Sequence, residues 1–123
     1  MRKFANNNKM YYVYMLRCED DSIYTGFTTD VKRRFHEHIE KNKPYGKYTR
    51  THPPVKIEAV WRCYDRSKAC SLEYHIKRLT KIQKERIINS SDEFAGLFRA
   101  KLDCSCYFSV NPDDLLKEGY NNG

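Results

Sequence analysis

The sequence YYVYMLR at residues 11–17, followed by IYTGF at residues 23–27, decides the fold of this chain. Both runs are rich in tyrosine, valine, isoleucine and phenylalanine, which favour β-strands, and a polar turn at residues 19–22 separates them. This order predicts two antiparallel strands joined in a hairpin. Because the connection is short, Tyr14 and Tyr24 are expected to lie on the same small sheet.

A basic amphipathic helix is predicted next, from Asp30 to about Lys41. Asp30 suits an N-cap. The apolar residues of the helix recur every four positions, at Val31, Phe35 and Ile39. Arg34 and His38 are also four residues apart, so they form a second stripe beside the apolar one. This stripe is expected to face the edge of the sheet that carries the tyrosines.

The rest of the chain is expected to contain one more strand and several helices. Residues 42–56 hold four glycine or proline residues among lysines and an arginine, which is typical of a loop with a basic surface. Residues 57–64 alternate in the manner of a half-buried third strand. Ser67 is a possible cap for the next helix, whose apolar stripe is Ala69, Leu72, Ile76 and Leu79.

The helical pattern then restarts several times. Thr80 with Gln83, and Ser90 with Glu93, match the capping-box pattern at the start of a helix. A last short helix is expected from residue 111 to Lys117. The predicted fold is therefore α/β (α+β), with a small three-stranded antiparallel sheet flanked by helices.

Glu73 is a charged residue in an unusual position on the predicted helix with the stripe Ala69, Leu72, Ile76 and Leu79. It falls on the margin of an apolar, core-facing stripe, four residues after Ala69. Two interpretations are open. In one, the carboxylate is a metal ligand. In the other, it forms an ordinary helical ion pair with Lys77 or Lys81, worth a few tenths of a kcal/mol.

Charge and composition describe the probable partner class. The 123 residues include 23 Lys+Arg against 16 Asp+Glu, a formal charge of +7, which fits a polyanion such as nucleic acid. No apolar run approaches the roughly 20 residues of a membrane-spanning helix, and no secretory signal is evident at the start. We therefore expect a cytoplasmic protein without a membrane partner.

The five cysteines form no regular framework. An odd number in a cytoplasmic chain favours free thiols. Cys104 and Cys106 make one close pair, but a zinc site usually needs four ligands and no second pair stands at a suitable spacing.

The ordered set of motifs resembles the GIY-YIG nuclease family. Tyr12-Val13-Tyr14 stands where the family has its first motif, with Tyr12 in place of the glycine, and Tyr24-Thr25-Gly26 stands at the second. The segment DVKRRF at residues 30–35 is similar to the segment that carries the family's arginine. The chain looks most like the short stand-alone bacterial members, through KYTR at residues 47–50 and PPV at residues 53–55. It is also similar to the nuclease domain of a bacterial excision-repair subunit.

This resemblance implies a metal-dependent endonuclease that hydrolyses DNA phosphodiester bonds, in repair or recombination. Tyr14 would orient and deprotonate a water, Tyr24 would position the water or phosphate, and Arg34 would neutralise the scissile phosphate. Glu73 would hold one divalent cation, Mg2+ or Mn2+. His38 is a weaker candidate for a proton relay. Gly26 is expected to serve the backbone of the second motif. Six basic residues are expected to bind nucleic acid: Arg33, Lys47, Arg50, Lys77, Lys81 and Lys84.

The expected organisation is a flexible tail at residues 1–9, a nuclease-like domain at 10–90 and a C-terminal helical extension at 91–123. The extension is expected to pack on the same domain or to pair two copies of the chain as a homodimer. Weak intrinsic sequence specificity suggests a partner protein. Two other functions stay open: a nucleic-acid-binding module of the same fold that does not cut, and a protein-interaction adaptor.

Overall fold

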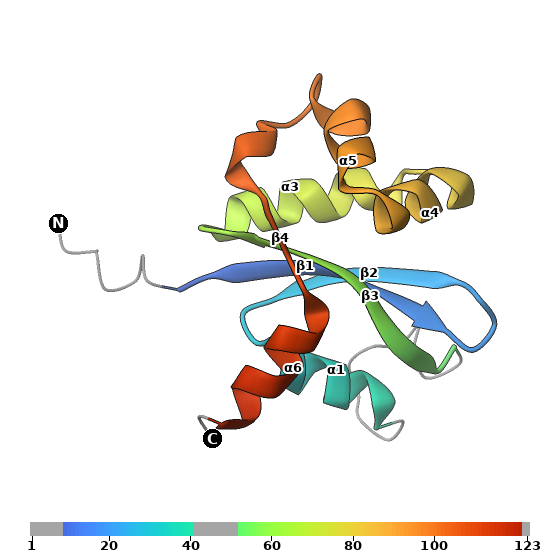
Figure 1. Cartoon of the computed structure of the whole chain (residues 1–123), viewed down its shortest axis with the longest axis vertical. Coiled ribbons are helices and arrows are strands. Elements are labelled where there is room, and N and C mark those ends of the chain that lie inside the picture. Colours follow the sequence, from blue (N-terminus) through green and yellow to red (C-terminus); the bar gives the residue numbers. More distant parts are fainter. Residues whose placement is uncertain (1–8, 41–51, 122–123) are drawn as a thin grey trace, which may run out of the picture.

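A four-stranded antiparallel sheet forms the centre of the protein, with strand order β2-β1-β3-β4 (Figure 1). The computed structural model describes residues 9–40 and 52–121. The strands are β1 (Tyr11–Cys18), β2 (Ile23–Thr28), β3 (Pro54–Cys63) and β4 (Phe108–Val110). The predicted hairpin is confirmed: β1 pairs antiparallel with β2, and Tyr14 stands opposite Gly26.

Helices cover both faces of this sheet. On one side lie α3 (Arg66–Lys77), α4 (Lys81–Asn89) and α5 (Ser91–Phe98), and on the other lie α1 (Val31–Ile39) and α6 (Pro112–Asn121) (Figure 1). We call these sides the α3 face and the α1 face. A short 3-10 turn, Cys104–Cys106, leads from α5 to β4. The C-terminal extension therefore contributes elements to both faces.

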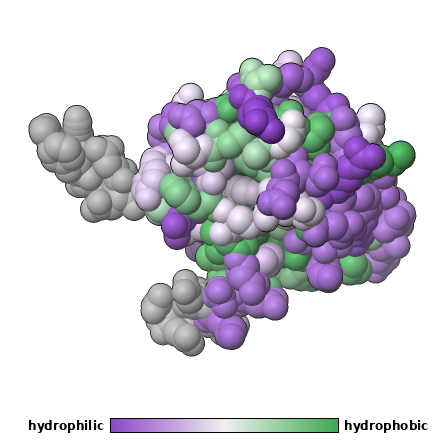
Figure 2. All heavy atoms as spheres, turned by 45° about the horizontal axis from the view of Figure 1, so that its top comes forward, coloured by the Kyte–Doolittle hydropathy of each residue, from purple (hydrophilic) through white to green (hydrophobic). Residues whose placement is uncertain are grey.

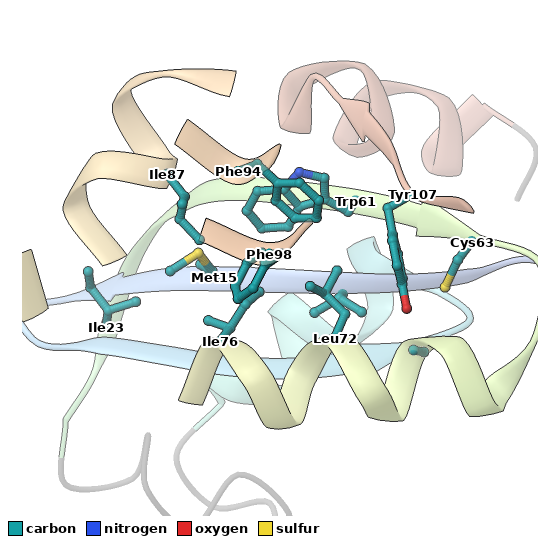
Figure 3. Packing of buried hydrophobic residues seen from close by; sticks show 12 residues of the cluster. Met15, Ile23, Trp61, Cys63, Leu72, Ile76, Ile87, Phe94, Phe98 and Tyr107 are labelled. Carbon is teal, nitrogen blue, oxygen red and sulfur yellow. The ribbon is translucent and has the colours of Figure 1, made fainter. Parts of the chain in front are cut away.

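The α3 face buries the larger apolar core (Figure 3). Side chains from the strands meet those of α3, α4 and α5, and Trp61 stacks on Phe94 with ring centroids 5.1 Å apart. Phe98 is 1% exposed and packs edge-to-face on Phe94. Tyr107 donates its hydroxyl to the Lys68 carbonyl at 2.8 Å, so its polar atom is satisfied inside this layer. Three residues of the extension, Phe94, Phe98 and Tyr107, thus belong to the core.

The α1 face carries a smaller cluster that includes the first tyrosine of the motif. Tyr14 packs there with Leu16 and Val60, under α1 and the α6 residues Leu115 and Leu116. Strict alternation along residues 57–64 predicted Ile57 on the opposite face from Val60, and this is wrong. Met15 pairs with Ala59, whereas the next residue, Leu16, pairs with Ile57, so Glu58 has no partner in the register. This β-bulge at Glu58 turns the Ile57 side chain to the α1 face.

The sheet has four strands rather than the three that the sequence predicts. β4 belongs to the extension and pairs with β3 through Phe108 opposite Arg62 and Val110 opposite Val60. Three residues are too few to show an alternating pattern, so no strand was predicted there. The extension is accordingly not purely helical, and it contributes side chains to the core on the α3 face.

Helix boundaries follow capping chemistry with two corrections. The Thr80 and Gln83 capping box is confirmed. Asp65 rather than Ser67 caps α3, accepting from the Lys68 N–H at 2.8 Å. Ser90 precedes α5 but makes no side-chain cap hydrogen bond. α1 ends at Ile39, two residues before the predicted end, and Ile39 is 44% exposed instead of belonging to the buried stripe.

The outer surface shows no membrane-spanning element: within the described ranges, no helix is long and apolar enough to cross a bilayer. Figure 2 views the molecule obliquely from the side of the α3 face and shows hydrophilic residues over much of the visible surface, with hydrophobic residues in several patches. All five cysteines are free thiols. The predicted tail, apart from Lys9, lies outside the described residues, as do most residues of the predicted loop at 42–56.

Candidate active site

Two tyrosines from neighbouring strands meet on the α1 face. Tyr14 on β1 and Tyr24 on β2 stand two residues apart in the register, because Leu16 pairs with Tyr24 and Gly26 pairs with Tyr14. Their ring centroids are 6.3 Å apart. Tyr14 is 2% exposed, whereas Tyr24 is half-buried. The predicted pair is therefore present, with one hydroxyl deep and one ring nearer to solvent.

Gly26 gives the Tyr14 hydroxyl its space. A Cβ atom at position 26 would lie 2.7 Å from Tyr14 Oη and 2.9 Å from Tyr14 Cζ, which is closer than real Cβ atoms approach such neighbours. Any side chain there would displace the phenol. The glycine thus serves a close approach rather than an unusual backbone angle.

His38 is the direct partner of the deep tyrosine. Its Nε2 atom is hydrogen-bonded to the Tyr14 hydroxyl at 2.9 Å, and its ring lies 5.0 Å from that of Tyr24. His38 is 2% exposed, so it is not the surface residue that a charged helix would suggest. Burial and the nearby Arg34 lower the pKa of His38 to about 4, against a weaker opposing effect of Glu37. The imidazole is therefore neutral near pH 7.

The acidity of Tyr14 is set by competing neighbours. Burial raises the pKa of Tyr14 well above its usual value near 10, and Tyr24 and Glu73 raise it further. Arg34 acts in the opposite direction, through its charge and hydrogen bonding to the phenol. Because burial is the largest effect, Tyr14 is a neutral phenol at rest. Arg34 is thus a cationic neighbour of this phenol, but its effect on the pKa does not outweigh burial.

Arg34, not Arg33, is the arginine beside the tyrosines. Arg34 Nε lies 3.2 Å from Glu37 Oε1, and Glu37 is only 12% exposed. Arg33 is 55% exposed and pairs with Glu37 at 2.9 Å and Asp30 at 3.7 Å. The spacing from Asp30 had indicated the same arginine. Sequence reasoning missed Glu37, although its place three residues after Arg34 on a helix is a usable signal.

Glu73 lies on α3, which packs over β2 and β1 on the face of the sheet opposite to Tyr14. It is close enough to Tyr14 to raise the pKa of that phenol. Its carboxylate is 22% exposed and lies 3.4 Å from Lys77 Nζ. Both interpretations of Glu73 therefore have support in the geometry, the ion pair by contact and the site role by proximity to Tyr14.

The described side chains offer a divalent ion one carboxylate rather than a cage. No group of three His, Cys, Asp or Glu side chains among residues 9–40 and 52–121 is arranged to hold a metal. Mg2+ is commonly bound through one or two carboxylates while it keeps several waters and takes substrate oxygens as further ligands. A single half-buried carboxylate such as Glu73 fits that mode of binding.

The predicted DNA-contacting lysines gather near α3 and α4. Burial lowers the pKa of Lys84, and so do the charges of Lys77 and Lys81, which places the three lysines near one another. Lys81 begins α4 instead of continuing the flank of Glu73, and it pairs with Asp21 at 3.1 Å and Glu85 at 3.3 Å. Lys47 and Arg50 lie outside the described residues.

The chain is similar to known proteins over most of its length. The family model described as the GIY-YIG catalytic domain matches residues 10–86. A UPF0213 protein from Fusobacterium nucleatum is 52% identical over 84 residues, covering 68% of this chain and 82% of the relative. A UPF0213 protein from Cupriavidus necator is 46% identical over 74 residues, covering 60% and 78%. The solution NMR structure of a UPF0213 protein from Bacillus halodurans is 39% identical, covers 65% of this chain and 83% of that one, and aligns with a TM-score of 0.43.

Proposed function

We propose that this chain, which belongs to the GIY-YIG nuclease family, is a metal-dependent endonuclease that hydrolyses DNA phosphodiester bonds. The observation that carries the proposal is the buried hydrogen bond between Tyr14 and His38, flanked by Arg34 and influenced by Glu73. An apolar core needs none of these groups, and burying them has a cost that folding alone does not recover. Groups with perturbed pKa values that converge in this way are typical of catalytic sites.

The proposed mechanism begins with the water. Tyr14 orients the attacking water through its hydroxyl, and Tyr24 positions the water or the phosphate. Burial disfavours a tyrosinate at Tyr14, and it disfavours an imidazolium at His38. The two proton transfers are therefore proposed to be concerted: the water gives its proton to Tyr14 while Tyr14 gives its hydroxyl proton to His38. Glu37 favours the protonated imidazole and so stabilises the end of this relay. No separate phenolate is then required.

The phosphate side of the reaction belongs to Arg34 and Glu73. The Arg34 guanidinium offsets the charge that develops on the phosphoryl oxygens, in a planar fork that lysine does not reproduce. Glu73 would hold one Mg2+ or Mn2+ ion, which supplies Lewis acidity for the leaving oxygen. Without substrate, Lys77 Nζ lies 3.4 Å from Glu73 Oε2 and forms an ion pair with this carboxylate.

The remaining basic residues are proposed to hold the DNA backbone. Arg33, Lys77, Lys81 and Lys84 from the described part of the chain, with Lys47 and Arg50, would contact phosphates without reading bases. Such contacts position DNA but leave sequence specificity low, so we also propose that a partner protein or a second copy of the chain restricts cutting. A role in repair or recombination in the cytoplasm fits this kind of activity.

The test is cleavage of single-stranded, duplex, flap and branched DNA with Mg2+ present or absent. We expect wild-type cleavage to need the metal, and Glu73→Gln and Tyr14→Phe to lower its rate by roughly 100- to 10,000-fold. Tyr74→Phe is the matched control, since Tyr74 is 56% exposed on α3, and it should cut at the wild-type rate. Activity that survives both site changes would overturn the proposal.

The ion pair between Glu73 and Lys77 favours one second function, a nucleic-acid-binding module that does not cut. In that case Glu73 only supports its helix and Tyr14 only packs. Salt-sensitive DNA binding with no metal-dependent cleavage of any substrate would establish this alternative, because phosphate contacts release counterions whether or not chemistry follows.

A further inference from the structure

We propose that three residues at the β3–β4 edge bind an unpaired DNA strand. They are Arg62, Tyr64 and Phe108, which we call the β4 platform. The inference rests on the proposed nuclease function and adds a substrate class to it, DNA with a single-stranded segment beside the scissile bond. Phe108 lies beyond residues 10–86, so the platform includes a part of the chain that the family model does not match.

The strand register places the platform on the same side of the sheet as the tyrosines. Tyr12 pairs with Arg62, and Arg62 pairs with Phe108, so these three side chains form one row across β1, β3 and β4. Tyr12 precedes Tyr14 by two residues and therefore shares its face. The next row along the sheet holds Tyr14, Val60 and Val110. The platform and the site are thus in adjacent rows of the α1 face.

Contacts within the platform hold its rings in place while leaving them accessible. The Arg62 guanidinium lies over the Phe108 ring, 5.6 Å from its centroid. Tyr64 meets Phe108 edge-to-face at 5.9 Å. Yet Tyr64 is 53% exposed and Phe108 39% exposed, and neither packs against a buried cluster. The fold therefore uses little of their aromatic surface.

The distance to the site suits a short stretch of nucleic acid. Two residues along a strand and two strand spacings across the sheet separate Tyr14 from Phe108, together about 12 Å. Three to four stacked nucleotides span that length at about 3.4 Å each. α6 stands on the same face, with Leu115 and Leu116 packed against the cluster that contains Tyr14, so a longer strand would pass beside this helix rather than lie flat on the sheet.

Nearby acidic groups do not oppose such a strand. Asp65 follows Tyr64, but its carboxylate accepts the Lys68 N–H at 2.8 Å and so lies at the start of α3. The acidic first turn of α6, with Asp113 and Asp114, follows the end of β4 away from Phe108. Arg62 supplies the positive charge at the platform itself, within a chain of net charge +7.

Aromatic rings and an arginine plane recognise bases whose faces are free. Stacking of this kind tolerates any base, and it is available only where the partner strand is missing, because a duplex hides the base faces. The platform therefore predicts a preference for single-stranded segments with little sequence specificity.

The experiment measures DNA binding apart from cleavage. The Glu73→Gln protein, in EDTA, is titrated against a fluorescein-labelled 15-nucleotide oligo-dT and against a hairpin duplex of 15 base pairs. Tyr64→Leu and Phe108→Leu remove the aromatic face but keep an apolar side chain. Tyr74→Leu is the control, because Tyr74 is also an exposed tyrosine with an arginine, Arg78, 5.3 Å over its ring.

We expect each platform change to weaken oligo-dT binding roughly 5- to 50-fold and duplex binding less than twofold, while the control changes neither. Unchanged oligo-dT binding, or equal losses on both probes, would overturn the inference. If Phe108→Leu loosens β4, Tyr64→Leu at its exposed position decides the question alone. Wild-type cleavage with Mg2+ is assayed separately: absence of cleavage with the binding pattern intact would overturn the nuclease proposal and leave strand binding established.

Discussion

Both faces of the sheet bury side chains from solvent, but the α3 face buries mainly apolar ones and the α1 face also buries polar ones. The α3 face packs Trp61, Phe94 and Phe98 into a layer of hydrocarbon (Figure 3). The α1 face buries Tyr14 and His38 to the same extent, with their hydroxyl and imidazole joined at 2.9 Å. Burial stabilises the first group and strongly shifts the pKa of the second.

This contrast teaches how one small sheet divides its work. On the α3 face, side chains are interchangeable to the extent that they fill volume, and changes there should alter stability more than chemistry. On the α1 face, the buried Tyr14 hydroxyl has a particular partner in His38, so changes there should alter pKa values and the proposed reaction. Four predictions test this division.

The largest expected effect on stability comes from Phe98→Ala. Removing a 1%-exposed ring between Phe94 and His75 leaves a cavity, and we expect the free energy of unfolding to fall by about 3–5 kcal/mol. Ile82→Ala, at a 67%-exposed site, should change it by less than about 0.5 kcal/mol. Urea unfolding measures both. A small loss for Phe98→Ala would mean that the extension is an accessory to the domain.

The second prediction concerns acid stability on the α1 face. The pKa of His38 is lowered to about 4 in the folded chain from 6.5, so the unfolded chain binds more protons between these values and stability falls as the pH drops. Between pH 7.5 and 5.0 we expect His38 to account for a loss of about 2 kcal/mol. Comparing urea unfolding of wild type and His38→Gln at both pH values isolates it. Equal pH dependence in the two proteins would contradict a neutral buried imidazole.

The third prediction is that Gly26→Ala disturbs the position of the Tyr14 hydroxyl on the α1 face. The new methyl group meets Tyr14 Oη at 2.7 Å, so the phenol must move and its hydrogen bond to His38 must lengthen or break. We expect cleavage to fall at least tenfold and stability by about 1–3 kcal/mol. Gly96→Ala on α5 is the matched control, because its methyl group meets nothing within 4 Å and should leave cleavage unchanged. Wild-type cleavage by Gly26→Ala would show that the Tyr14 position is not critical.

The smallest expected effect is that of Lys77→Ala. Its ion pair with Glu73 is on a helix surface and Lys77 is 52% exposed, so thermal unfolding should report a change below about 0.5 kcal/mol. Mg2+ should bind at least as well as in wild type, because the carboxylate loses a competitor. A loss of stability well above this, without a change in metal binding, would assign Glu73 to the fold rather than to the site.

Most of the predicted site depended on local sequence alone. The hairpin follows from two strand-forming runs and a short polar turn, and it fixes Tyr14 opposite Gly26. The helix spacing of Arg34 and His38 likewise indicated one side of α1. The spacing does not show how deeply a side chain is buried: it placed His38 on the side of the helix toward the tyrosines but did not predict an exposure of only 2%.

The failures have a common physical cause. β4 has only three residues, and it is a strand because the edge of β3 offers hydrogen bonds, not because its own sequence demands it. The turn of Ile57 to the α1 face likewise depends on the register with β1. Such features are set by the partner strand, which a pattern read along one segment does not include.

The sequence by itself therefore determined the hairpin, the position of the basic helix and the identity of the residues with chemical potential, because these depend on neighbours within a few residues. Only the tertiary structure decided how deeply each was buried, which direction its pKa moved and which residues of the extension joined them. Those properties arise from packing between distant segments, where solvent is excluded and charges interact across the fold.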